Sequence, residues 1–217
     1  MNISSNIKAC IFDMDGLLID SEPFWEKADA KFFANHDKKH SPEINKHIMG
    51  MGHKQIIQYF KDEYAFEGDN EDLIKERVAL FYELFLKEIS SMDGAVDLVT
   101  KLHDKNIPLA IATSGHTAMK ANELLEKLHI ATYFKLFITG YDVKNSKPAP
   151  DIYLKTAEEL KVDPSHCLVF EDAPNGVKAG KAAGMSVFGV NKDKAIYAKL
   201  KEAGADKVFY SLTEVSV

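Results

Sequence analysis

Short apolar segments alternate along the chain with longer amphipathic ones. Most of the apolar segments are rich in β-branched or aromatic residues and end at Gly, Asp, Thr or Ser, a pattern typical of buried parallel strands. They lie at residues 7–12, 109–112, 136–139, 167–170, 186–190 and 207–210. Between them, apolar residues at helical spacing mark segments 93–106, 116–129 and 150–161. This alternation predicts an α/β fold with a doubly wound parallel sheet.

Residues 21–92 interrupt the alternation. This segment shows no convincing strand but several helical stripes of apolar residues, one of which begins at Phe24. We interpret it as a helical cap domain inserted after the first strand. Residues 1–20 and 93–217 are then expected to form one Rossmann-like core domain.

The composition excludes several classes of protein. With 217 residues, 46% hydrophobic and 28% charged, the chain is neither disordered, collagen-like nor a disulfide scaffold. A formal charge of −6 provides no basic surface for nucleic acid or anionic membrane. No apolar run reaches the length of a membrane span, and the N-terminal residues lack the features of a signal peptide. We expect a cytoplasmic protein, a monomer by default, whose cysteines Cys10 and Cys167 are buried, unreactive thiols.

Polar and charged side chains follow the predicted strands. Because ligands of open parallel sheets bind at the carboxyl ends of the strands, these side chains are expected to meet there. They are Asp13 and Asp15 after the first strand, Thr113 and Ser114 after the second, Lys147 in a proline-rich segment, and Glu171 and Asp172 after the fourth.

Each group has a chemical use and also a plainer structural explanation. Two carboxylates can divide nucleophilic attack from proton transfer, and a hydroxyl followed by backbone amides binds anions. A fixed ammonium neutralises phosphate, and adjacent acids on an apolar strand call for a cation such as Mg²⁺. Taken singly, the same residues could form an acidic turn, a helix cap and a surface lysine. Together they favour a single catalytic site, because successive strand ends carry complementary groups.

The order of these groups resembles the four signature motifs of the haloacid dehalogenase (HAD) superfamily. The helical insertion after the first motif resembles the small α-helical cap of that superfamily. Segments 12–22 and 146–151 are similar to its β-phosphoglucomutase-like branch, which contains sugar-phosphate phosphatases as well as the mutase. The resemblance covers nearly the whole chain.

The resemblance implies a role for each catalytic group. Asp13 would attack phosphorus and carry an aspartyl-phosphate. Asp15 would protonate the leaving alcohol and then activate water. Thr113 and the Ser114 amide would hold phosphoryl oxygens, and Lys147 would pair with Asp13 and the phosphoryl group.

The resemblance also implies Mg²⁺ as the cofactor. The Asp13 carboxylate, the backbone carbonyl of Asp15 and the Asp172 carboxylate would bind the ion, with Glu171 assisting directly or through water. This ligand set agrees with the preference of Mg²⁺ for carboxylates, water and phosphate oxygens.

Two activities of the branch remain open. In the mutase, the cap supplies a histidine after the hinge and an arginine that grips the distal phosphate, whereas the matching positions here are Trp25 and His53. Because an imidazole cannot grip phosphate as a guanidinium does, we expect a phosphatase acting on small sugar phosphates or nucleoside-like monophosphates. A phosphohexomutase is the alternative. Glu22, Gly50 and His116 are further candidates to contact the leaving group.

Two other classes fit less well. In a signalling receiver domain the acidic pair precedes the acceptor aspartate on a later strand, and there is no helical cap. A true dehalogenase acts on carbon without Mg²⁺ and would not need Asp15 or the acids at 171 and 172. We also expect the cap to swing about linkers near residues 20–21 and 92–93, which would carry Trp25 and the 49–53 loop over the leaving group.

Overall fold

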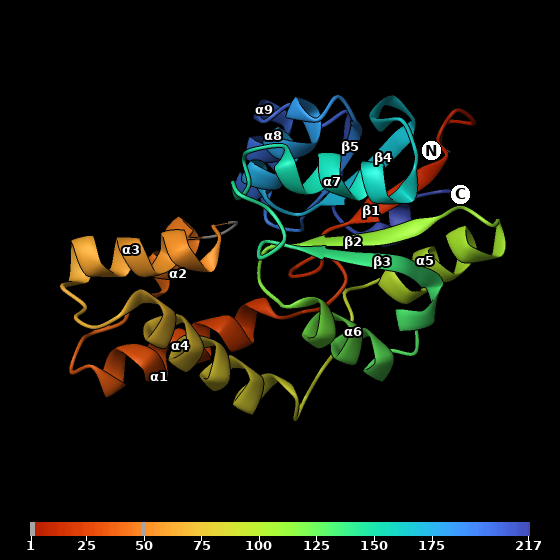
Figure 1. The fold of residues 1–217 in the computed structure, drawn as a ribbon. Coiled ribbons are helices and arrows are strands. Elements are labelled where there is room, and N and C mark those ends of the chain that lie inside the picture. The colour runs from red at the N-terminus through yellow and green to blue at the C-terminus, as the bar shows by residue number, and fades with distance from the viewer. Residues whose placement is uncertain (1–2, 49–50) are drawn as a thin grey trace.

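A parallel sheet flanked by helices forms the centre of the molecule (Figure 1). The structure is a computed structural model that describes residues 3–48 and 51–217, without the side chain of Glu22. The sheet order is β3-β2-β1-β4-β5-β6. The strands are β1 (Ala9–Phe12), β2 (Leu109–Thr113), β3 (Phe134–Thr139), β4 (Cys167–Glu171), β5 (Ser186–Val190) and β6 (Lys207–Phe209). The order reverses beside β1, so the doubly wound α/β fold is confirmed.

The central strands are apolar on both faces because helices cover both sides of the sheet. β1, β2 and β4 are buried along their whole length, and Ile11 lies in register with Ala110 and Val169. The rings of Phe12 and Phe170 stack with centroids 4.7 Å apart. Both cysteines are buried in these strands as free thiols, as expected. The central strands therefore form a rigid support for the residues at their carboxyl ends.

The helices of the sheet-containing part lie in two layers (Figure 1). They are α5 (Ala95–Asp104), α6 (Ala118–Lys127), α7 (Asp151–Leu160), α8 (Pro174–Ala182) and α9 (Lys194–Glu202). In Figure 1, α7, α8 and α9 lie above the sheet, and α5 and α6 lie below it. Short 3-10 turns lie at Ala131–Tyr133, Pro164–His166 and Leu212–Glu214. Within the described residues, no helix combines the length and apolarity needed to cross a membrane.

In the described part of the segment between β1 and α5 there are four helices. They are α1 (Glu22–Asn35), α2 (Pro42–Ile48), α3 (His53–Tyr64) and α4 (Asn70–Phe85). Aromatic side chains fill the space between them: Phe32 stacks on Phe66 with centroids 5.0 Å apart, and Phe33 meets Phe60 edge-on at 4.9 Å. Such aromatic packing buries much apolar area, so these helices are held to one another by more than their own helical propensity.

We call α1–α4 the helical layer. The two segments of chain that connect it to the sheet run side by side. Ile19 forms an antiparallel bridge with Ser91. The Asp20 N–H donates to the Ser90 carbonyl at 3.0 Å, and the Met92 N–H donates to the Leu18 carbonyl at 3.0 Å. The linkers expected near residues 20–21 and 92–93 are thus joined to each other by backbone hydrogen bonds.

Candidate active site

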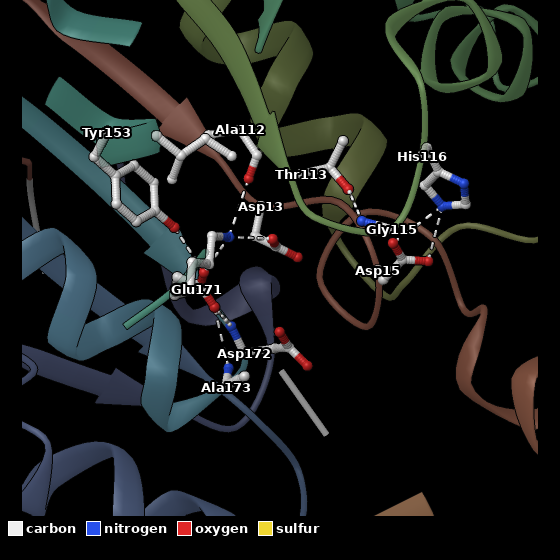
Figure 2. Close-up of polar contacts among 12 residues, drawn as sticks. Asp13, Asp15, Ala112, Thr113, Gly115, His116, Tyr153, Glu171, Asp172 and Ala173 are labelled. Carbon is white, nitrogen blue, oxygen red and sulfur yellow. Dashed lines mark hydrogen bonds and ion pairs between the residues drawn. The ribbon is translucent and has the colours of Figure 1, made fainter. Parts of the chain in front are cut away.

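The carboxyl ends of the central strands bring the predicted polar groups together (Figure 2). Asp13 directly follows β1, Thr113 ends β2 and Glu171 ends β4. A single cavity is lined by side chains from all four sequence groups: Asp13, Asp15, Ser114, Lys147, Glu171 and Asp172. Residues separated by more than 150 positions therefore share one site, as the parallel sheet requires.

Lys147 lies at the centre of the buried charges. Its Nζ donates to Asp13 Oδ1 at 2.5 Å, to Glu171 Oε1 at 2.7 Å and to the Ala112 carbonyl at 3.0 Å. Burial alone would lower the pKa of Lys147, but the two carboxylates raise it well above its ordinary value. Lys147 is 4% exposed, so it is a fixed buried cation and not a surface lysine.

Glu171 uses both carboxylate oxygens on protein groups. Oε1 also accepts a hydrogen bond from the Tyr153 hydroxyl at 2.6 Å, and Oε2 accepts from the backbone N–H groups of Asp172 and Ala173 at 3.1 and 3.2 Å. A Cβ at Gly176 would lie 1.7 Å from Glu171 Oε1, so only glycine leaves room for this carboxylate. Glu171 therefore fixes Lys147 and the loop that carries Asp172. Sequence reasoning missed Tyr153, which belongs to an ordinary apolar helix stripe.

The donor set of this cluster fits Mg²⁺. Asp13, Glu171 and Asp172 offer carboxylate oxygens that all lie within 4.8 Å of one another. Figure 2 shows the carboxylates of Asp13 and Asp172 pointing into the same space. Burial is the main cause that raises the pKa of Asp13 to about 7. The like charges of Glu171 and Asp15 raise it further, and Lys147 opposes the shift. A divalent cation would compensate this excess negative charge, and Mg²⁺ prefers such oxygen ligands.

Gly16 allows Asp172 to approach the first motif. Its backbone has φ of +74°, and a Cβ there would lie 2.5 Å from Asp172 Oδ2. Gly184 has a nearly identical φ of +78°, but a Cβ there would meet nothing within 4 Å. An alanine at either position would strain the backbone, but only an alanine at Gly16 would also displace the Asp172 carboxylate. Comparing the two substitutions therefore distinguishes these effects.

We expect Gly16→Ala to lower kcat/KM for phosphate release about a hundredfold, because small displacements of positioned groups are costly in catalysis. Gly184→Ala should lose about 1 kcal/mol of stability from its positive φ and keep its activity. Steady-state kinetics and thermal unfolding of both variants make the comparison. Equal activities of the two variants would show that the contact between Gly16 and Asp172 is unimportant.

Asp15 is held as a carboxylate by three donors. Its Oδ1 accepts hydrogen bonds from Ser21 Oγ at 2.6 Å, His116 Nε2 at 3.0 Å and Trp25 Nε1 at 3.3 Å. Although burial opposes ionisation, the attraction of His116 and the hydrogen bonds from His116, Ser21 and Trp25 lower the pKa of Asp15 to about 2. At neutral pH Asp15 is therefore ionised in the protein by itself.

His116 links Asp15 to the helical layer. The side chain is 1% exposed, and its Nδ1 lies 2.7 Å from the hydroxyl of Tyr82 in α4. Because the Asp15 carboxylate only accepts, Nε2 of His116 carries the proton of that bond. His116 is not among the residues lining the cavity, so the structure places it beside Asp15 and not against the space for a leaving group. Tyr82 gave no signal of this contact in the sequence.

The loop after β2 has a more specific arrangement than a helix cap. Thr113 is fully buried, and its Oγ1 accepts a hydrogen bond from the Gly115 N–H at 3.2 Å. The cap of α6 is Thr117, whose hydroxyl accepts from the Lys120 N–H. Thr113 and Ser114 therefore do not cap this helix, and Ser114 lines the cavity. A loop of this kind before a helix N-terminus suits an anion.

Two candidates from the helical layer, Trp25 and His53, also line the cavity. The Trp25 ring stacks on Phe81 with centroids 3.8 Å apart and lies 4.5 Å from the guanidinium of Arg77. His53 Nε2 lies 2.8 Å from the Gly115 carbonyl, which ties α3 to the loop after β2. Of the remaining candidates, Gly50 and the side chain of Glu22 lie outside the described residues.

Comparison with known proteins identifies the family to which this geometry belongs. A family model described as haloacid dehalogenase-like hydrolase matches residues 10–190. The chain belongs to this family. The resemblance of its motifs to the HAD superfamily is therefore confirmed.

Individual relatives agree with this assignment. The chain is 35% identical to a phosphorylated carbohydrates phosphatase of Thermotoga maritima over 208 residues, which covers 92% of each protein. CbbY of Rhodobacter sphaeroides, solved with phosphate, superposes with a TM-score of 0.82 at 28% identity over 96% of both chains. β-Phosphoglucomutase of Clostridium difficile superposes with a TM-score of 0.83 at 25% identity over 96% of this chain and 92% of that one. The chain is a HAD-like phosphomonoesterase.

Proposed function

We propose that this HAD hydrolase is a Mg²⁺-dependent phosphatase of small phosphorylated sugars or nucleoside-like monophosphates, acting through an aspartyl-phosphate on Asp13. The observation that carries the proposal is the pairing of buried Asp13 with Lys147, 2.5 Å apart, at the edge of the acidic cluster. The similarity to a phosphatase of phosphorylated carbohydrates supports the substrate class.

The chemistry divides between two aspartates. Asp13 Oδ would attack phosphorus while Lys147 and the loop at Thr113 and Ser114 hold the phosphoryl oxygens. Asp13, Asp172 and the Asp15 carbonyl would hold Mg²⁺, which supplies charge neutralisation when bound. Glu171 would hold Lys147 in place, since its oxygens are already shared with protein donors.

Asp15 would move the protons. It would give a proton to the leaving alcohol oxygen and then take one from the water that attacks the aspartyl-phosphate. The three donors around Oδ1 favour the carboxylate that the second step needs. The negative charge of an arriving phosphoryl group favours the protonated form that the first step needs.

The phosphohexomutase remains the second candidate, because a solved β-phosphoglucomutase shares the fold over nearly the whole chain. Hydrolysis requires less of the active site than the mutase reaction does, since only water must reach Asp15. The positions of the mutase's histidine and arginine are filled here by Trp25 and His53, which supports the phosphatase. We further propose that residues 21–92 move as a cap and that the protein works as a cytoplasmic monomer.

A screen of phosphate release over sugar phosphates and nucleotides tests this proposal. We expect the protein to hydrolyse a narrow set of esters with Mg²⁺ and to lose that activity when EDTA removes the metal. The isomerisation of β-glucose 1-phosphate is measured in the same plates. Glucose 6-phosphate formed without phosphate release would establish the mutase instead.

A further inference from the structure

The cavity extends from the acidic cluster into the helical layer, where its wall becomes more apolar. Trp25, Ile48, Met51 and Ile56 contribute mostly apolar surface there. The polar members of the wall on this side are Asp29, Asn45, His53 and Arg77. Because the phosphoryl group belongs at Asp13, this second part of the cavity is the space for the leaving alcohol.

Among the described residues, Arg77 is the cationic side chain on this side of the cavity wall, but its guanidinium is already paired within the protein. Nε donates to Asp29 Oδ1 at 2.5 Å and Nη2 donates to Asp29 Oδ2 at 2.9 Å, a bidentate pair. The side chains are 4% and 0% exposed, so water does not screen the pair. Asp29 thus neutralises Arg77 within the protein.

The remaining guanidinium nitrogen of Arg77, Nη1, also has a hydrogen-bond partner within the protein. Arg77 Nη1 lies 3.3 Å from His53 Nδ1, and His53 Nε2 lies 2.8 Å from the Gly115 carbonyl. Since the carbonyl accepts, Nε2 carries the ring proton and Nδ1 accepts from Arg77. Burial and the nearby Arg77 lower the pKa of His53 to about 4, so the imidazole is uncharged at neutral pH.

The polar side chains around the Arg77–Asp29 pair also form hydrogen bonds with one another. Asp29 Oδ2 also accepts from Asn45 Nδ2 at 3.0 Å, and Asn45 Oδ1 lies 2.6 Å from His40 Nε2. Of the residues that the structure describes, Arg77 and Lys147 are the Lys or Arg side chains in the cavity wall. Both are paired with carboxylates, and Lys147 serves the phosphoryl end.

We propose that this site selects phosphate esters whose alcohol is uncharged and carries no second phosphate, and that Asp29 enforces the selection by occupying Arg77. The inference rests on the proposed phosphatase function and narrows its substrates. An anionic alcohol would bring a second negative charge beside the Asp29 carboxylate without meeting an unpaired cation, and such desolvated charge is costly. An uncharged polyol or sugar brings no charge to be desolvated, so its transfer to the same wall costs less than that of an anionic alcohol.

Ester pairs that differ in charge at one position test the selection. The pairs are glycerol 3-phosphate against 3-phosphoglycerate, and fructose 6-phosphate against fructose 1,6-bisphosphate. For each, kcat/KM with Mg²⁺ is compared, and we expect the uncharged alcohol to be favoured by about tenfold or more, roughly the cost of one unpaired charge-assisted contact. Binding is measured separately by the fluorescence of Trp25, the single tryptophan of the chain, in the Asp13→Asn background.

Asp29→Asn tests the cause of the selection. It retains the shape of the side chain and removes the charge that neutralises Arg77. We expect the preference for the uncharged alcohol to fall about fivefold or more, because the freed guanidinium now attracts the anionic alcohol. The preference should not change in Asp97→Asn, which removes an exposed carboxylate paired with Lys101.

A second route avoids the buried ion pair in case Asp29→Asn does not fold. Met51 is partly exposed and lines the cavity, so Met51→Lys adds a cation without opening the network. Relative to the uncharged control Met51→Gln, it should raise kcat/KM for the anionic members of each pair. The inference is overturned if, in every pair, the unaltered protein binds and hydrolyses the anionic ester at least as well. It is also overturned if a folded Asp29→Asn keeps the full preference.

These outcomes are separable from failure of the proposed function. If no ester releases phosphate with Mg²⁺, the phosphatase proposal fails, and the Trp25 titration alone decides the inference. If esters are hydrolysed without discrimination by charge, the phosphatase stands and only the inference is overturned.

Discussion

The Asp13→Asn variant is expected to release phosphate at least about a thousandfold more slowly than the unaltered protein, in line with losses seen when a nucleophile is removed. An amide cannot form the phosphoryl-enzyme, whereas it can still accept the hydrogen bond from Lys147 Nζ. The measurement is kcat at saturating ester and Mg²⁺.

The same substitution should leave the fold intact. Burial together with the like charges of Glu171 and Asp15 raises the pKa of Asp13 to about 7 even though Lys147 lowers it, so without a bound metal ion the charge of Asp13 is unfavourable. An uncharged amide relieves that repulsion, and the thermal unfolding midpoint should not fall. Asp97→Asn serves as the control for loss of an exposed carboxylate. Activity within about tenfold of the unaltered protein would rule out Asp13 as the nucleophile.

Lys147→Met is expected to lower both activity and stability. Removing the ammonium leaves Asp13 and Glu171 facing each other in a buried site, and breaking a buried ion pair costs about 3–5 kcal/mol. We expect kcat to fall about a hundredfold or more, because the phosphoryl group loses its fixed cation. Chemical unfolding at neutral pH and steady-state kinetics measure the two effects.

Lys181→Met provides the matched control. Lys181 pairs with both oxygens of Asp206 at 2.8 Å, but this pair is partly exposed, and such pairs contribute about 1 kcal/mol or less. Mg²⁺ should stabilise Lys147→Met more than the unaltered protein, because the cation then compensates a larger excess of negative charge. If the two lysine variants unfold alike, Lys147 does not hold the acidic cluster together.

The acidic and basic groups of the site could be predicted because each directly follows a strand or lies in a recognisable loop. The carboxyl ends of parallel strands meet by construction, so residues 13, 113 and 171 needed no further information to be placed together. Strand bounds were less predictable. β3 begins at Phe134, two residues before its predicted start, because the backbone of Phe134 and Lys135 continues the ladder with β2 through a register shift although Lys135 is exposed.

The histidines show the limit of local reasoning. Polar residues are mostly exposed, yet His53 and His116 are 8% and 1% exposed. Each can be buried because its two ring nitrogens have partners that are distant in the sequence. These are Gly115 and Arg77 for His53, and Asp15 and Tyr82 for His116. No spacing in the sequence marks such pairs, since packing of the helical layer on the sheet chooses the partners.

The sequence by itself therefore determined the sheet, the inserted helices and the polar groups that meet at the strand ends, because strand periodicity and the residues at strand ends are local properties. Only the tertiary structure decided the state of Arg77, which lies on a stripe with apolar residues in the sequence. Asp29 is 48 residues away and neutralises it through a buried bidentate pair. Charge balance in a cavity depends on which side chains meet, and that is fixed by packing over the whole chain.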